Sequence, residues 1–212
     1  MRHILTIILL VLAQAGVLAQ TEKKATAAEA EMMIAAVNRT AEGIHTLQGR
    51  FTQVKTMSFL NDKMTSTGML YLTDKGQLRW EFTSPYSYIF IINDNQVTIR
   101  SGKKTQNIDM KSSRLFEGIA RIMVNSMTGR CLQKNGDFDV EMYTRGTEWI
   151  AWLTPKKAQM KKMFKLVKLH FSSTQNMVTS VEMTEPSGDN TVIELKDITL
   201  NQPVDEAVFT LH

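Results

Sequence analysis

The chain has 212 residues, of which 43% are hydrophobic and 22% charged, and a formal net charge of +4. This length suits one domain with a sizeable core and is too short for two full ones. A single cysteine excludes a disulfide framework and a cysteine-rich zinc module, and the mild positive charge does not predict nucleic-acid binding.

The N-terminus has the pattern of a secretory signal peptide. A positive start is followed by the apolar run Ile4–Leu12, and small residues end at Ala19. We therefore expect residues 1–19 to be removed and residues 20–212 to form one exported, soluble domain. A membrane anchor is the alternative, but the polar Gln14 interrupts the segment after the apolar run.

A helix is predicted next, from about Ala27 to about Glu42. Thr26 and Glu29 have the spacing of a capping box, in which each side chain accepts a hydrogen bond from the other's backbone. Apolar residues recur behind them at helical spacing and form a narrow stripe, and Gly43 marks the exit.

Beyond this helix the apolar period changes to two, which is typical of strands. Strands are expected at 51–54, 67–72, 77–82, 88–92, 97–99, 137–143, 147–153, 164–172, 176–184, 191–199 and 208–210. A second helix at 115–127, ending at Gly129, interrupts them. Short turns between consecutive strands indicate antiparallel hairpins and exclude a βαβ sheet.

The predicted fold class is α+β, mainly β. An antiparallel sheet of about ten to eleven strands curls, here into an open half barrel, and the two helices are expected to cover its concave apolar side. An apolar interior that can be vacated is a lipid site, whereas one that cannot is only a core. The pattern of residues does not separate these two cases.

Six segments, in order along nearly the whole mature chain, resemble the periplasmic outer-membrane lipoprotein carrier family (LolA-like). The most specific is the strand that contains Trp80 and ends before Pro85. The segments are Leu47–Gln53, Gly68–Tyr71, Leu78–Pro85, Ile91–Val97, Leu153–Lys156 and Ala207–Leu211.

The resemblance implies a monomeric periplasmic carrier that makes and breaks no covalent bond. Such a protein would accept acylated lipoproteins from an inner-membrane ABC-type transporter. It would shield their acyl chains in an apolar cavity and deliver them to an outer-membrane acceptor. On this basis the chain is expected to be no enzyme, to need no cofactor or metal, and to bind no nucleic acid.

The resemblance and the strand pattern together suggest which residues line the cavity. In the family, the arginine of an Arg-Pro pair just upstream of this strand latches a helical lid, and Asp74-Lys75 stand at that position here. Arg79 lies nearby and is the candidate substitute for this latch. The alternative for Arg79 is a solvated, outward-facing position. The candidate lining residues are Leu70, Leu72, Leu78, Trp80, Phe82, Ile89, Ile91, Phe116, Ile119 and Met123.

Other candidate sites have simpler interpretations. His45 and His170 lack ligand spacing, which disfavours a metal site, and the many methionines suit an adaptable apolar lining better than copper ligation. Cys131 has no partner cysteine and is expected to be a buried apolar residue. The lysines between Lys156 and Lys168 either form a solvated hairpin tip or meet anionic headgroups or an acidic transporter face.

Two further functions remain open for a chain with this resemblance. One is a lipid- or ligand-sensing regulatory module of the same fold, which acts through a protein partner. The other is an outer-membrane acceptor, which is the weakest because no cysteine follows the apolar N-terminal run for lipid attachment. The sequence does not distinguish carrying from sensing.

Overall fold

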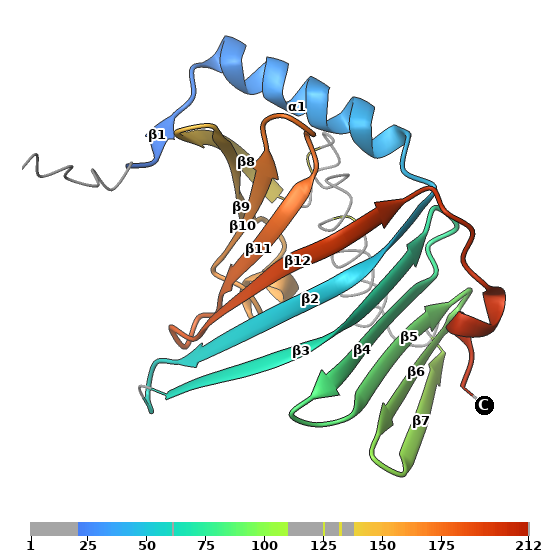
Figure 1. The fold of residues 1–212 in the computed structure, drawn as a ribbon. Helices are drawn as coiled ribbons and strands as arrows, with labels where there is room; N and C mark the ends of the chain where they lie inside the picture. The colour runs from blue at the N-terminus through green and yellow to red at the C-terminus, as the bar shows by residue number, and fades with distance from the viewer. Residues whose placement is uncertain (1–20, 61, 110–124, 126–131, 133–137, 212) are drawn as a thin grey trace, which may run out of the picture.

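The computed structural model describes residues 21–60, 62–109, 125, 132 and 138–211, and these form one long, curled antiparallel sheet (Figure 1). Its twelve strands are β1 (Lys23–Lys24), β2 (Thr46–Met57), β3 (Asp62–Thr73), β4 (Leu78–Ser84), β5 (Tyr88–Asn93), β6 (Gln96–Ser101), β7 (Lys104–Asp109), β8 (Phe138–Arg145), β9 (Glu148–Pro155), β10 (Leu166–Ser172), β11 (Val178–Thr184) and β12 (Asn190–Leu200). The predicted class, a mainly β open half barrel, is confirmed.

Strand order explains how the two halves of the chain become one sheet. The order is β1-β8-β9-β10-β11-β12-β2-β3-β4-β5-β6-β7, so most neighbours are hairpin partners. The long strand β12 pairs with β2, with Val192 opposite Val54, and this ladder joins the C-terminal strands to the N-terminal ones. The polar strands β1 and β7 end the order, and the sequence pattern predicted neither of them.

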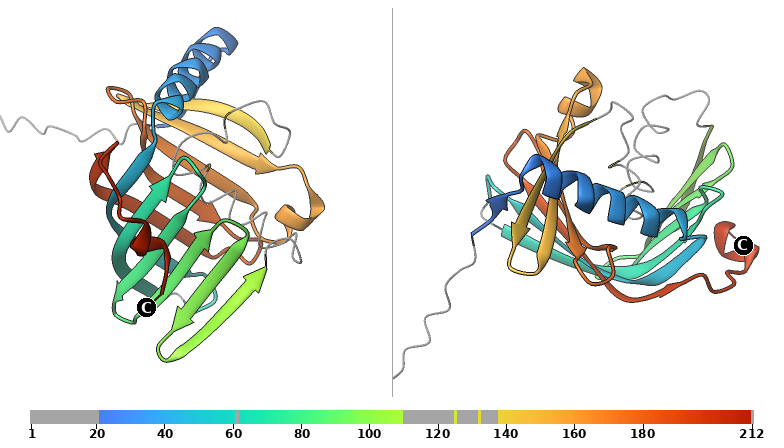
Figure 2. Two further views of the ribbon diagram at one scale, coloured as in Figure 1. Left: turned by 90° about the vertical axis from the view of Figure 1, so that its right-hand side faces the viewer. Right: turned by 90° about the horizontal axis from the view of Figure 1, so that it is seen from above.

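The predicted first helix is confirmed as α1 (Ala27–Glu42). The Thr26 hydroxyl accepts a hydrogen bond from the Glu29 amide at 3.3 Å, and the Thr26 amide donates to the Glu29 carboxylate at 2.7 Å. The helix lies across the curl of the sheet (Figure 2), where Met33 and Val37 join the core. Its apolar stripe is narrow, and the opposite face is exposed.

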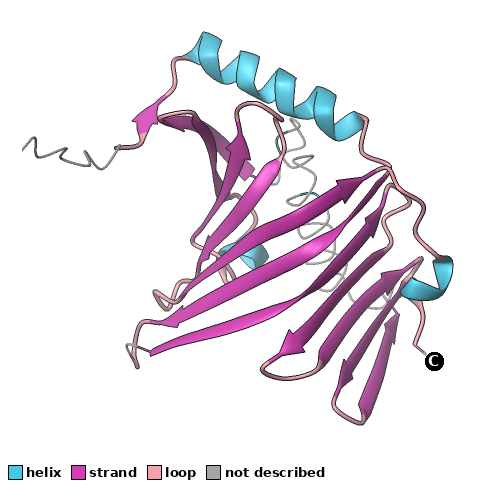
Figure 3. Ribbon diagram, in the orientation of Figure 1, coloured by secondary structure: helices cyan, strands magenta, loops and turns pink. Residues whose placement is uncertain are grey.

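Two other short helices are present among the described residues, α3 (Ala158–Lys161) and the 3-10 turn η3 (Glu206–Phe209), seen in cyan in Figure 3. The strand expected at 208–210 is therefore wrong. The Asp205 carboxylate accepts a hydrogen bond from the Ala207 amide at 2.9 Å, and this cap starts a turn where the residue types favour a strand. The predicted helix at 115–127 lies outside the described residues.

Side chains alternate between the two faces of the sheet, and the concave face is apolar. The main core combines this face with the buried side of α1. Its strand residues include Leu47, Phe51, Leu70, Leu72, Leu78, Trp80, Phe90, Ile92, Val97, Phe138, Met142, Ala151, Leu153, Val167, Leu169, Phe171, Val181 and Ile193.

The outer face of strands β8–β11 is polar and ties down the N-terminal segment. The Glu22 carboxylate accepts hydrogen bonds from the Trp152 indole at 2.9 Å and from Lys168 at 3.0 Å. The Lys168 ammonium also lies 4.3 Å from the centre of the Trp152 ring, a cation–π contact. The first described residues are thus fixed on the outside of the sheet.

A buried histidine on the same outer face lies between two carboxylates. His170 Nδ1 lies 3.0 Å from Glu148, and its Nε2 lies 3.8 Å from Glu182. The interaction with His170, with a further hydrogen bond from Asn190, lowers the pKa of Glu182 to about 2. Since this folded-state pKa is depressed, its stabilising effect is present at neutral pH and is lost as the pH falls from about 4.5 toward 2.

Gly68 is required where the core aromatic residues meet the backbone. A Cβ added at Gly68 would lie 1.9 Å from the Glu81 carbonyl oxygen and 2.7 Å from the Phe51 ring. The β3–β4 register shifts between Thr67 and Gly68, so the close approach accompanies a bulge. Steric exclusion of any larger side chain thus explains the glycine that begins the Gly68–Tyr71 segment.

We predict that Gly68→Ala lowers the free energy of unfolding by roughly 3 kcal/mol or more, because a backbone oxygen cannot move aside easily. Gly43→Ala is the matched control, since its nearest contact would be 3.5 Å away. Urea unfolding measures both variants. Equal stability of the two would contradict the steric role of Gly68.

Candidate functional site

Five aromatic rings form a row along the concave face of strands β2, β4 and β5. The Phe51 ring centre lies 4.8 Å from that of Trp80 and 5.1 Å from that of Phe82. Phe82 in turn stacks on Tyr86 at 5.7 Å and meets Tyr88 edge-on at 5.8 Å. The row runs from the buried centre of the sheet to Tyr86 in the β4–β5 turn, which is partly exposed.

Strand register brings these residues together from separate segments of the sequence. Trp80 of β4 lies opposite Leu70 of β3 and opposite Phe90 of β5. Leu78, two residues earlier on the same face, lies between Leu72 and Ile92. Because cross-strand neighbours on one face lie close together, three strands present one continuous apolar surface.

Trp80 has an unusual polar environment. Only 3% of this residue is exposed, and its indole nitrogen is buried without a hydrogen-bond partner among the described residues. An unpaired buried donor costs free energy, and a tryptophan in a core usually finds a partner for it. Within the described part of the chain, the surroundings of this indole nitrogen are apolar.

Five predicted lining residues lie together in this concave core. Leu70, Leu72, Leu78 and Trp80 are buried in it, and Phe82 packs against it. Phe51, Phe90 and Ile92 belong to the same surface, although they were not among the candidates. The sequence signal for Phe51 is alternation, since Phe51 follows Leu47 by four residues along one strand face.

Ile89 and Ile91 were placed on the wrong face. They form a separate small core with Phe209, while Phe90 and Ile92 face the concave side. Pairing of Trp80 with Phe90 fixes this orientation. Strand β5 is apolar on both faces, so alternation alone could not decide it.

The remaining three candidates, Phe116, Ile119 and Met123, lie outside the described residues, as does Cys131. The structure therefore leaves their part of the proposed lining as a prediction.

Arg79 lies on the outer face and binds the C-terminal segment. This position corrects the expectation that Arg79 latches a helical lid. Its Nη1 donates a hydrogen bond to the Val208 carbonyl at 3.0 Å, and its Nε donates to Glu81 at 2.8 Å. Asn93 donates a further bond to the Phe209 carbonyl at 3.3 Å. Figure 1 shows this segment on the outside of β4 and β5. The outward orientation was expected as the alternative, but the guanidinium is largely buried.

Among the described residues, His, Cys, Asp and Glu side chains form no group of three or more that could hold a metal ion. Within the same residues, no helix combines the length and the hydropathy that crossing a membrane requires. The described residues of the concave core offer apolar contact.

An open, curled antiparallel sheet with an apolar concave face is the fold of lipid- and lipoprotein-binding carriers. A sequence profile described as outer membrane lipoprotein carrier protein LolA matches residues 42–212. The chain therefore belongs to this family, as its resemblance predicted. Comparison with curated protein sequences finds no match.

Solved structures share the fold at low sequence identity. An uncharacterised conserved protein from Thermus thermophilus has a TM-score of 0.53 and 10% identity, with 87% of this chain and 94% of that chain covered. MucB from Pseudomonas aeruginosa, in its complex with MucA, has a TM-score of 0.50 and 14% identity, with 85% and 61% covered. A LolA superfamily protein from Nitrosomonas europaea has a TM-score of 0.47 and 12% identity, with 86% and 97% covered.

We predict that Arg79→Ala raises the hydrogen-exchange rates of the Val208 and Thr210 amides by about tenfold or more, because a charge-assisted bond to this segment is lost. Arg50→Ala, which removes an exposed ion pair on β2, is the control and should leave these rates unchanged. Unchanged exchange in Arg79→Ala would contradict the assignment of Arg79 to the C-terminal segment.

Proposed function

We propose that this protein is a periplasmic carrier that shields the acyl chains of lipoproteins against its concave face. It would receive them from an inner-membrane ABC-type transporter and release them to an outer-membrane acceptor. The observation that supports this most is the aromatic row around Trp80, whose indole nitrogen has no described partner. Membership of the carrier family supports the same activity.

Burial of acyl chains supplies the binding energy that a carrier needs. Each methylene removed from water contributes about 0.8 kcal/mol. Flexible chains need a lining that adapts to them, and the concave side offers aromatic and aliphatic side chains with Met33 and Met142 among them. No bond of the cargo is made or broken, so this function requires neither a catalytic group nor a cofactor.

Helix α1 is one element that would have to move away from the concave face when an acyl chain binds. It contributes Met33 and Val37 to the same core as the strand residues, but most of its surface faces water. A narrow contact of this kind costs less to open than a helix that is buried on all sides. Displacement of α1 would expose the concave face while the sheet ladders stay paired.

Tryptophan quenching by brominated acyl chains tests the proposed site. The chain has three tryptophans, Trp80 on the concave face, Trp149 packed against the core and Trp152 on the outer face. A variant that retains only Trp80 (Trp149→Phe with Trp152→Phe) should lose most of its fluorescence on binding a brominated fatty acid, because bromine quenches on contact.

The matched control retains only Trp152 (Trp80→Phe with Trp149→Phe) and should remain bright. Circular dichroism verifies that both variants keep the fold. Quenching of Trp152 with no quenching of Trp80 would place the acyl chain on the outer face and refute the proposed site.

A further inference from the structure

Two large apolar side chains project into water at the β2–β3 hairpin. Phe59 is 95% exposed and Leu60 is 63% exposed. Most other large apolar side chains of the described residues are buried or half-buried. Neither residue contributes to the concave core, so neither is explained by the proposed cargo site.

The hairpin presents these side chains from a fixed base. The Ser58 amide donates a hydrogen bond to the Asp189 carboxylate at 2.9 Å, and its hydroxyl donates to the Ser187 carbonyl at 3.1 Å. The hydrogen bonds from Ser58 lower the pKa of Asp189, which keeps it ionised. The residue directly before Phe59 is therefore anchored to the neighbouring β11–β12 turn.

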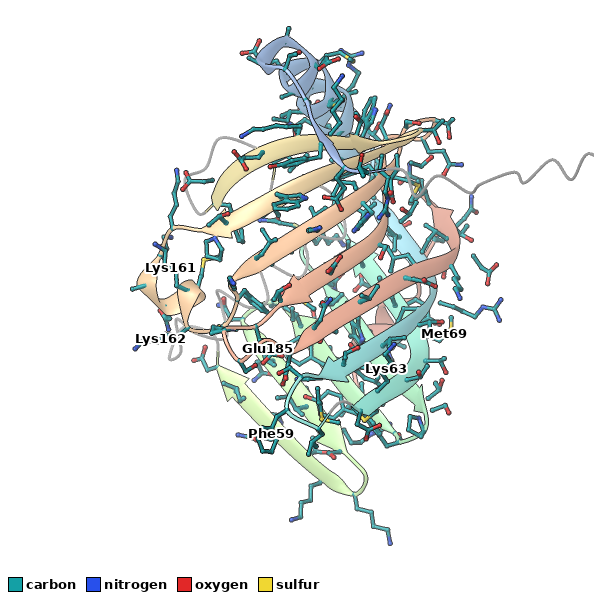
Figure 4. The ribbon with its side chains drawn as sticks, turned by 90° about the vertical axis from the view of Figure 1, so that its left-hand side faces the viewer. Phe59, Lys63, Met69, Lys161, Lys162 and Glu185 are labelled. Atoms are coloured by element: carbon teal, nitrogen blue, oxygen red, sulfur yellow. The ribbon has the colours of Figure 1, made fainter. Side chains whose placement is uncertain are left out.

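Lysines gather at the same end of the sheet. The strand ladders from β9 to β3 bring together the β9–β10, β11–β12 and β2–β3 connections at this end, which we call the lysine rim (residues 55–60, 62–63, 156–165 and 185–189). Figure 4 shows Lys161, Lys162, Glu185 and Phe59 on this side of the molecule. The rim contains seven lysines (Lys55, Lys63, Lys156, Lys157, Lys161, Lys162 and Lys165) and three carboxylates (Asp62, Glu185 and Asp189).

Several of these lysines form no ion pair with the residues that the structure describes. Lys55 pairs with Glu185, and Lys156 pairs with Asp139. Lys63, Lys161, Lys162 and Lys165 are exposed and form no ion pair among the described residues. Their positive charge lies at the same end of the sheet as the exposed Phe59 and Leu60.

We propose that the lysine rim docks on the surface of an anionic phospholipid bilayer. The lysines would meet headgroup phosphates, while Phe59 and Leu60 enter the boundary between headgroups and acyl chains. An aromatic and an aliphatic side chain among lysines is the composition of interfacial membrane anchors. Lysine ammonium groups on flexible stems suit a fluid layer of phosphates, which requires no fixed geometry.

The shape of the rim favours a bilayer over a protein partner. Phe59 stands on a projecting hairpin tip and not in a hollow, and it can enter a soft lipid layer without a complementary pocket. Tyr86, the outer end of the aromatic row, lies in a turn at this same end of the sheet. An acyl chain leaving a bilayer docked here would meet this end of the row first, a route that rests on the proposed carrier function.

Vesicle co-sedimentation tests the docking surface without any lipoprotein. We expect the wild-type chain to bind vesicles of phosphatidylcholine mixed with phosphatidylglycerol, to bind pure phosphatidylcholine much more weakly, and to lose binding at high salt. Phe59→Ser with Leu60→Ser should weaken binding roughly tenfold or more. Lys161→Gln with Lys162→Gln should weaken it by about fivefold for each lysine.

Matched control variants test whether vesicle binding depends on the rim or on any exposed apolar side chain or positive charge of the protein. Met32→Ser removes an exposed apolar side chain on α1, and Lys75→Gln with Lys196→Gln removes the same charge away from the rim. Both should bind vesicles like the wild type. Equal losses in the rim variants and their controls would overturn the proposal. Absence of binding to anionic vesicles would also overturn it, and capture of a protein partner by the rim would then be the result to explain.

The two proposals fail separately. Quenching of Trp80 by a free brominated fatty acid requires no vesicle, and vesicle binding through the rim requires no acyl chain on the concave face. Failure of the wild-type chain to bind anionic vesicles, with intact Trp80 quenching, would reject only the docking surface.

Discussion

The concave face of the curled sheet cannot be left in water, and the rest of the structure depends on that constraint. Alternation along strands β2–β6 and β8–β12 places apolar side chains on one side, and curling brings the two halves of the sheet around them. Helix α1 contributes its narrow apolar stripe to the same core. Under the proposed function, an acyl chain would take the place of this narrow helical cover on the concave face.

The outer face has the opposite role, because it fixes the two ends of the described chain. Glu22 is held by Trp152 and Lys168, and Val208 is held by Arg79. These contacts involve polar or charged atoms and do not reach the concave core. The ends are therefore fixed by interactions that are independent of whatever occupies the concave face.

Local signals in the sequence were sufficient for some elements. The first helix was predicted with its correct ends because the Thr26–Glu29 capping box and Gly43 act within one turn of the chain. The antiparallel hairpins followed from short turns, and Leu78, Trp80 and Phe82 were expected together because alternation along one strand is unambiguous when its other residues are polar.

Other features depend on tertiary neighbours and could not be predicted. Strand β5 is apolar on both faces, so only its register with β4 shows that Ile89 and Ile91 point outward. The Val208–Thr210 segment has the residue types of a strand, but the Asp205 cap makes it a turn. The lysine rim arises from three connections that are distant in sequence, and only the sheet order reveals that they share one end.

Native mass spectrometry of cargo transfer tests the proposed carrier function most directly. The chain starting at Gln20, its predicted mature form, is mixed with a purified triacylated lipoprotein in detergent and then diluted. We predict a soluble one-to-one complex that passes its lipoprotein to fresh membranes. A protein that retains only a small lipid and ignores the lipoprotein would contradict carriage, and would indicate that the fold senses a ligand for a protein partner.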